Sequence, residues 1–204
     1  LHKYWFDKYG IDASYSVIEA NDKDLKKVIK KIREHELNGI NVTLPFKQKI
    51  INQTDKIVND AELTGSVNTI LLDNNKIIGE NTDVFGLQAA YLKEIDNCVS
   101  KNALVIGAGG VSPSVILSLQ KSGVKKISVT NRTNEKCIFL KKKFNYLNIL
   151  QWENLENEIK NFESFTLMTH SSSEVHPFLS FKNGFAPLIS NCLTNSKYFR
   201  LFDP

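Results

Sequence analysis

Apolar side chains recur every three or four residues after Asn21, and this period predicts a helix with Asn21 as its N-cap and Gly39 beyond its end. Residues 40–44 instead alternate strictly between apolar and polar side chains. Because successive side chains of a strand point to opposite faces, this alternation predicts a half-buried strand with Asn41 and Thr43 on its polar face. The apolar positions of the helix are Leu25, Val28, Ile29 and Ile32.

The same criteria predict several more elements in the first half of the chain. They are a helix over residues 1–9, a strand over 15–18, a hairpin of strands 66–72 and 76–78 with its turn at 73–75, and a helix over 84–95. This half is therefore expected to be a mixed α/β unit.

Strands and helices alternate strictly in the second half. The predicted strands cover 103–106, 127–130, 147–150, 165–168 and 198–202, and the predicted helices cover 111–120 and 134–144. Such a βαβαβ order predicts a parallel, doubly wound sheet of the Rossmann type. We therefore predict an α/β protein of two domains, residues 1–97 and residues 98–204, with the boundary near residues 96–100.

The composition is that of an ordinary globular protein, with 42% hydrophobic and 24% charged residues in a chain of 204. No apolar run approaches the roughly 20 residues of a membrane-spanning helix. Cys98, Cys137 and Cys192 form no CxxC pair, which disfavours a disulfide scaffold and a zinc site. The four histidines have no ligand spacing, so no metal is predicted. We expect a cytoplasmic protein without a membrane partner.

The net charge of +4 is unevenly distributed along the chain. Residues 1–100 carry 13 basic and 15 acidic side chains, whereas residues 101–204 carry 13 and 7. A basic second half favours a phosphate-bearing ligand. Nucleic acid is disfavoured because no aromatic residues are interleaved with the basic ones and no DNA-binding motif is present.

A glycine-rich turn joins the predicted strand 103–106 to the predicted helix 111–120. Such a turn lets the backbone approach a pyrophosphate, whose charge the N-terminus of the helix stabilises. Ser112 occupies the third position of the usual glycine motif, so an ordinary tight turn is the alternative. The residues of this predicted cofactor site are Gly107, Ala108, Gly109, Gly110 and Val111.

The next predicted strand ends at Asn131-Arg132-Thr133. NAD-binding domains have a carboxylate here, which binds the ribose 2′-hydroxyl. This chain has Arg132 instead, and a guanidinium beside amide and hydroxyl donors suits a 2′-phosphate. The motif therefore predicts NADP, with an exposed arginine at a helix start as the alternative.

Three segments of the first half carry a more specific signal. They are Gly39-Ile40-Asn41-Val42-Thr43-Leu44-Pro45-Phe46-Lys47, Gly65-Ser66-Val67-Asn68-Thr69 and Gly79-Glu80-Asn81-Thr82-Asp83. The glycine turn and Asn131-Arg132-Thr133 follow them along the chain. In this order, the five segments resemble the signature segments of the shikimate dehydrogenase family, and the resemblance covers about residues 1–136.

The resemblance implies reversible, NADPH-dependent reduction of 3-dehydroshikimate to shikimate in chorismate and aromatic amino-acid biosynthesis. It implies that Lys47 and Asp83 are the catalytic pair, with Lys47 as the acid that protonates the forming alkoxide. Thr43 and Asn68, with Asp83, match the substrate-binding positions. Lys136 stands where many members have a second phosphate-binding arginine.

Taken singly, each of these residues has a simpler interpretation. Lys47 could be a solvated lysine, Asp83 the N-cap of the predicted helix 84–95, and Asn68 a residue that holds a strand end. Because all three residues lie in segments that resemble the family's signature motifs, the functional interpretation is favoured.

The resemblance also implies missing ends. The family's first strand with its serine pair would precede Leu1, and its substrate tyrosine and glutamine would follow Pro204, so we expect a chain truncated at both ends. Met168-Thr169-His170 departs from the family's Asn-Ala-Thr. The alternatives are a quinate/shikimate dehydrogenase, a non-catalytic NADP-binding fragment and, less well supported, a folate-type dehydrogenase. The chain is expected to be a monomer or a homodimer.

Overall fold

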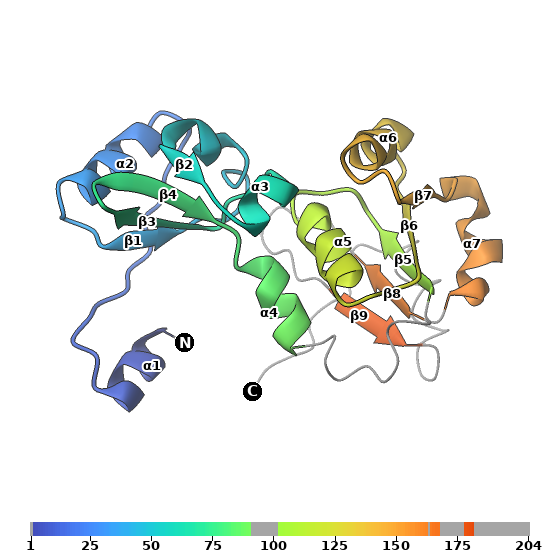
Figure 1. Ribbon diagram of the computed structural model, residues 1–204, viewed down its shortest axis with the longest axis horizontal. Helices are drawn as coiled ribbons and strands as arrows, with labels where there is room; N and C mark the ends of the chain where they lie inside the picture. The colour runs from blue at the N-terminus through green and yellow to red at the C-terminus, as the bar shows by residue number, and fades with distance from the viewer. Residues whose placement is uncertain (1, 91–101, 163, 168–177, 182–204) are drawn as a thin grey trace.

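The computed structural model describes residues 2–90, 102–162, 164–167 and 178–181, and it places two β-sheets side by side with helices α3 (Asp60–Thr64) and α4 (Asp83–Ala90) between them (Figure 1). One sheet is built from the first half of the chain and the other from the second half. The predicted α/β class is confirmed. The predicted boundary at residues 96–100 lies outside the described residues.

The first sheet has the strand order β1-β3-β4-β2. Its central pair is a hairpin in which Asp73 pairs with Lys76, and the two turn residues, Asn74 and Asn75, have positive φ angles of 46° and 62°. Asparagine tolerates this left-handed conformation, which a two-residue hairpin requires, so the predicted hairpin is confirmed. The strands are β1 (Gly39–Asn41), β2 (Lys56–Ile57), β3 (Thr69–Asp73) and β4 (Lys76–Glu80).

Helix α2 (Leu25–Arg33) covers this sheet with the apolar stripe that the sequence predicts. Ile32 and Ile50 are completely buried there, the latter from the short helix η1 (Lys49–Gln53). Helix α1 (His2–Tyr9) buries no residue, and its first residue contacts the sheet: His2 Nε2 lies 3.4 Å from Asn41 Oδ1 of β1 (Figure 1).

The second sheet has the order β7-β6-β5-β8-β9, and the first four of these strands are parallel. Ala103 and Val105 of β5 pack against the core formed with α5 and α6, whereas Leu104 and Ile106 pack on the opposite face against α7 and its flanking turns. Because both faces of the sheet are covered by helices, the predicted doubly wound fold is confirmed. Strand β9 runs antiparallel to β8 at the edge.

The predicted elements of this second half that the structure describes agree with it to about one residue at each end, whereas the strand at 178–181 and the helices within 152–161 were not predicted. The strands are β5 (Asn102–Ile106), β6 (Lys126–Thr130), β7 (Asn148–Ile149), β8 (Ser164–Leu167) and β9 (Phe178–Phe181). The helices are α5 (Ser112–Lys121), α6 (Asn134–Lys143) and α7 (Leu155–Glu158), the last between the short helices η4 (Trp152–Asn154) and η5 (Ile159–Asn161).

The structure corrects three local predictions. Residues 11–20 contain neither helix nor strand, so the strand predicted over 15–18 is wrong: no strand of the sheet pairs with it. The regular helix begins only at Leu25, because residues 22–24 form a turn before it. Within that turn Asn21 Oδ1 accepts from the Lys23 N–H at 2.9 Å and Asp24 Oδ2 accepts from the Asn21 N–H at 3.1 Å, which is the bonding expected of the predicted cap. Strand β1 ends at Asn41 because its partner β3 begins opposite, at Thr69.

Several elements lie outside these comparisons. The predicted strand 198–202 and residues 91–95 of the predicted helix 84–95 fall outside the described residues. Within the described part of the chain, no helix is both long enough and apolar enough to cross a bilayer.

Candidate active site

The Asp83 carboxylate binds two side chains that come from distant parts of the first half of the chain. Lys47 Nζ donates to Asp83 Oδ2 at 2.7 Å, and Asn68 Nδ2 donates to Asp83 Oδ1 at 2.7 Å. The Lys47 side chain is 13% exposed and that of Asp83 is 25% exposed. This cluster brings together both predicted catalytic residues and one predicted substrate-binding residue.

Backbone hydrogen bonds hold the segments that carry these side chains. The Lys47 carbonyl accepts from the Val67 N–H at 2.8 Å, which fixes the Lys47 turn against the chain just before Asn68. The Asn68 N–H donates to Glu80 O at 3.0 Å, and Asn68 O accepts from the Val42 N–H at 2.7 Å. The Asn68 backbone therefore bonds both the segment that follows β1 and the last residue of β4. Its side chain lies at the edge of the sheet, next to the first residue of α4.

The orientation of the Asn68 amide follows from its other contacts. Its Oδ1 accepts from the Thr82 N–H at 2.9 Å, and a backbone N–H can only donate. The Nδ2 group must therefore face the Asp83 carboxylate. Thr69 Oγ1 also donates to Oδ1, at 3.1 Å.

Thr82 is a site residue that the sequence analysis left unassigned. Its hydroxyl lies 3.0 Å from Asn68 Nδ2 and 3.2 Å from Asn68 Oδ1. The signal was present, because Thr82 directly precedes Asp83 in one of the quoted segments.

The N-cap of α4 is Asn81 and not Asp83. The Asn81 Oδ1 accepts from the Asp83 N–H at 3.0 Å and from the Val84 N–H at 3.3 Å, which is the capping pattern of a residue just before a helix. Asp83 is the first residue of α4, and both of its carboxylate oxygens are left for Lys47 and Asn68. The simpler interpretation of Asp83 as a cap is therefore wrong.

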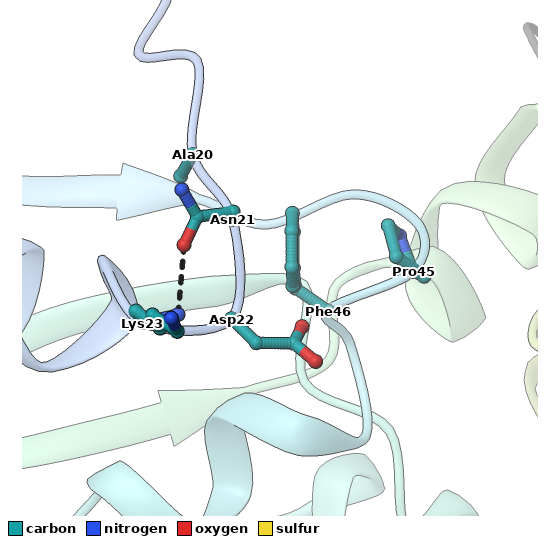
Figure 2. A pocket seen from close by; sticks show the side chains of 6 residues that line it. All are labelled: Ala20, Asn21, Asp22, Lys23, Pro45 and Phe46. Atoms are coloured by element: carbon teal, nitrogen blue, oxygen red, sulfur yellow. Dashed lines mark hydrogen bonds between the residues drawn. The ribbon is translucent and has the colours of Figure 1, made fainter.

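Thr43 lies two residues beyond β1 and is exposed, as its predicted place on the polar face requires. The structure gives its hydroxyl no partner among the described residues. Near this segment, an open groove is lined by Pro45 and Phe46 on one side and by the turn of residues 20–23 on the other (Figure 2). The groove is not lined by Lys47 or Asp83.

The predicted cofactor turn follows β5 and opens α5. Gly107 has a φ of 112°, a conformation that favours glycine, and its N–H donates to Thr130 O at 2.7 Å. The N–H groups of Gly109, Gly110 and Val111 have no acceptor within the residues that the structure describes. A Cβ added to Gly109 would enter open space. The turn thus presents three free donors at a helix N-terminus, where an anion is stabilised.

The glycine turn also approaches the first half of the chain closely. A Cβ on Gly110 would lie 2.8 Å from Leu44 Cδ2, between Thr43 and the Lys47 turn. The predicted cofactor site and the predicted substrate site are therefore adjacent.

Asn131 links the second cofactor segment to the glycine turn. Its Oδ1 accepts from the Ala108 N–H at 3.3 Å, and its Nδ2 donates to Thr133 O at 3.0 Å. Arg132, Thr133 and Lys136 are exposed, and their side chains have no ion pair or hydrogen bond to other described residues. Two cationic groups are thus free for a phosphate beside the turn. Met168-Thr169-His170 lies outside the described residues.

Two family models match the chain. The model described as shikimate dehydrogenase substrate binding domain matches residues 1–70, and the model described as shikimate / quinate 5-dehydrogenase matches residues 90–181.

Individual relatives agree with these models. A curated relative from Pelagibacter ubique, named shikimate dehydrogenase (NADP(+)), is 42% identical over 152 residues, which are 74% of this chain and 57% of the relative. A relative of the same name from Methanococcus maripaludis is 31% identical over 191 residues, 90% of this chain and 68% of its own length. The crystal structure of shikimate dehydrogenase from Aquifex aeolicus matches with a TM-score of 0.76 and 34% identity, over 85% of this chain and 65% of that one. The chain thus spans little more than half of the Pelagibacter relative.

Proposed function

The chain belongs to the shikimate dehydrogenase family, and we propose that it catalyses the reversible NADPH-dependent reduction of 3-dehydroshikimate to shikimate. The observation that carries this proposal is the Lys47–Asp83–Asn68 cluster beside the glycine turn. Relatives that share the match are named shikimate dehydrogenase (NADP(+)). The reaction would belong to chorismate and aromatic amino-acid biosynthesis.

In this proposal Lys47 is the general acid. Reduction of a ketone leaves an alkoxide, which needs a proton from a positioned donor. The Lys47 ammonium is held at 2.7 Å by Asp83, so its direction is fixed before substrate arrives. Asn68 and Thr43 bind substrate hydroxyls, and Asp83 accepts from the substrate as well as from Lys47.

The cofactor site fits a dinucleotide phosphate. The free N–H groups of Gly109, Gly110 and Val111, together with the open space beside Gly109, suit a pyrophosphate. We propose that Gly107, Ala108 and Asn131 shape this site. Arg132, Thr133 and Lys136 then bind the 2′-phosphate. When bound, NADPH supplies the hydride that reduces the ketone carbon.

The domain division remains part of the proposal, with residues 1–97 as the substrate-binding and catalytic domain and residues 98–204 as the NADP-binding domain. The two separate sheets support it. A cytoplasmic location is proposed because Cys137 is a free, buried thiol, as expected in a reducing compartment. The assembly is proposed to be a monomer or a homodimer.

The test is an assay of NADPH oxidation with 3-dehydroshikimate, using the natural full-length protein. Lys47→Ala should lower kcat by roughly 10²–10⁴-fold with little change in NADPH affinity, because proton donation acts in the transition state. The matched control is Lys49→Ala, since Lys49 lies two residues away and pairs with Asp22 at the surface. A loss of less than about tenfold in Lys47→Ala would remove Lys47 from this role.

The same assay separates the alternatives. The second family model names quinate as well as shikimate, so quinate with NADP is measured in parallel. Faster turnover of quinate would identify a quinate/shikimate dehydrogenase. NADPH binding without any turnover would identify a non-catalytic cofactor-binding protein.

A further inference from the structure

We propose that Asn81 is a positioning residue that couples the catalytic carboxylate to the helix of the cofactor site. This inference rests on the proposed function. Asn81 itself touches neither Lys47 nor the exposed face of the glycine turn, and it is only 6% exposed. It therefore acts through the groups that it holds.

One half of the Asn81 amide fixes the start of α4. Its Oδ1 occupies the N–H groups of Asp83 and Val84. A short carboxylate at a helix start readily bonds these same groups. Because Asn81 satisfies them, the Asp83 carboxylate is free to point at Lys47 and Asn68.

The other half of the amide reaches across to the second sheet's layer of helices. Asn81 Nδ2 donates to Ser114 Oγ at 3.0 Å, in a contact that is fully buried, and Ser114 lies in the first turn of α5. The same turn is bound to the glycine turn, since Ser112 Oγ donates to Gly107 O at 3.0 Å. Hydrogen bonds at both ends of the first turn of α5, together with the backbone of that turn, thus join Asp83 to the backbone that would hold the pyrophosphate.

Two more acceptors fix the direction of this amide. Nδ2 also lies 2.9 Å from Ser66 O and 3.1 Å from Thr64 Oγ1, so its two hydrogens are shared among three acceptors. An asparagine fits this position because its side chain has the required length and carries both a carbonyl oxygen that accepts and an NH2 group with two hydrogens that donate. A serine can replace the cap, because its hydroxyl also accepts from the backbone of a helix start, but it is too short to bridge to Ser114.

Hydride transfer depends on the relative placement of the two sites. A misplacement of about 1 Å can cost on the order of 10²-fold in rate. Loosening the Asn81 bridge should therefore slow chemistry while each site still binds its own ligand.

The experiment uses the full-length enzyme with Asn81→Ser and Ser114→Ala. For Asn81→Ser we expect kcat to fall by about ten- to a hundredfold, with KM for 3-dehydroshikimate and Kd for NADPH within about threefold of wild type. The deuterium isotope effect with NADPH labelled at the transferred hydrogen should rise, because hydride transfer becomes slower than product release. Ser114→Ala should act in the same direction but less, and the double variant should lose no more than Asn81→Ser alone.

Ser118→Ala is the structural control. The Ser118 hydroxyl lies 3.0 Å from Val84 O and 2.8 Å from Ser114 O, which share its one hydrogen. It therefore joins the same two helices without a hydrogen bond to the Asn81 amide, to the Asp83 side chain or to the glycine turn. It should lower Tm and leave kcat and the isotope effect unchanged.

The outcomes separate the inference from the function on which it rests. Wild-type turnover with an unchanged kcat and isotope effect in Asn81→Ser overturns the inference alone, even if Tm falls. If Asn81→Ser fails to fold, Ser114→Ala provides the test, because it keeps Asn81 as the cap of α4 and keeps the contacts of Asn81 with Ser66 and Thr64. An unchanged isotope effect in Ser114→Ala would then overturn the inference that Asn81 couples the two sites. A wild type without turnover overturns both proposals.

Discussion

The Lys47–Asp83 pair should contribute more to the stability of the folded protein than its surface counterpart at the same distance. Its N–O distance is 2.7 Å, and its side chains are 13% and 25% exposed. The Lys49–Asp22 pair has the same 2.7 Å distance, but its side chains are 50% and 62% exposed. The two pairs therefore differ in burial and not in geometry, which makes one a control for the other.

The expected magnitudes follow from this difference in burial. Exposed pairs typically contribute about 0.2–1 kcal/mol in double-mutant cycles, and we expect this of Lys49–Asp22. A hydrogen bond to a charged group that is largely removed from water contributes about 1.5–3 kcal/mol, and we expect this coupling for Lys47–Asp83. In Asp83→Asn the new amide cannot accept from both Lys47 and Asn68, so one donor is left without its partner.

The measurement is urea unfolding at pH 7 of wild type, Lys47→Met, Asp83→Asn and the double variant, with the corresponding cycle for Lys49 and Asp22. Both cycles are repeated at about 1 M salt, where the Debye length is only about 3 Å. At this salt concentration the coupling energy of the exposed Lys49–Asp22 pair should nearly disappear, whereas that of the less exposed Lys47–Asp83 pair should largely persist. Equal coupling energies in the two cycles, or equal loss in salt, would refute the argument from burial.

Three further predictions concern other parts of the chain. Arg132→Ala should weaken NADPH binding by about ten- to a hundredfold, the loss of a charge-assisted phosphate contact, and leave NADH binding unchanged; unchanged NADPH binding in a fluorescence titration would place the phosphate elsewhere. The hydrogen bond from Arg33, followed by that from the Ile77 N–H, lowers the pKa of Asp55 below its ordinary value. This stabilisation is complete above the ordinary carboxyl pKa of 3.8 and is lost only as the pH falls through the lowered pKa of the folded protein. Asp55→Asn should therefore be less stable than wild type at pH 7, and in thermal melts the difference should shrink only at pH values below 3.8; a pH-independent difference would contradict this. Burial raises the pKa of the Cys137 thiol to about 11, so iodoacetamide at pH 8 should modify it only after unfolding, and rapid labelling of Cys137 in the native protein, read by mass spectrometry, would contradict its burial.

The regular elements that the sequence predicted well are those whose patterns are local. The apolar stripe of α2 and the buried runs of β5 and β6 repeat within a few residues, and the structure places them in the two cores. The elements that the sequence missed are short. Strand β2 has two residues and α3 has five, which is too few to show a period. The opposite error, a strand over 15–18, shows that β-forming residues make no strand without a partner strand to bond.

The candidate site shows the same division. The segments that carry Lys47, Asn68 and Asp83 could be found from the sequence alone, because side-chain chemistry and the residue order of a short motif are local properties of the sequence. Their arrangement could not, since Lys47 and Asp83 are 36 positions apart and meet only where β1, β3 and α4 converge. Their stated roles in substrate binding and catalysis remain predictions.

The start of α4 shows most clearly what only the tertiary structure decided. From sequence, Asp83 was the N-cap candidate, because its short carboxylate directly precedes Val84, the first residue of the predicted helix. In the folded protein the Asp83 carboxylate meets the Lys47 ammonium at 2.7 Å, a charge-assisted hydrogen bond between two ionised groups, and its other oxygen accepts from Asn68. Asn81 is left to cap the helix and to bond Ser114 across the molecule. The sequence offered two roles for Asp83 and none for Asn81. The long-range contact with Lys47 decided between them, because this partner is 36 positions away along the chain.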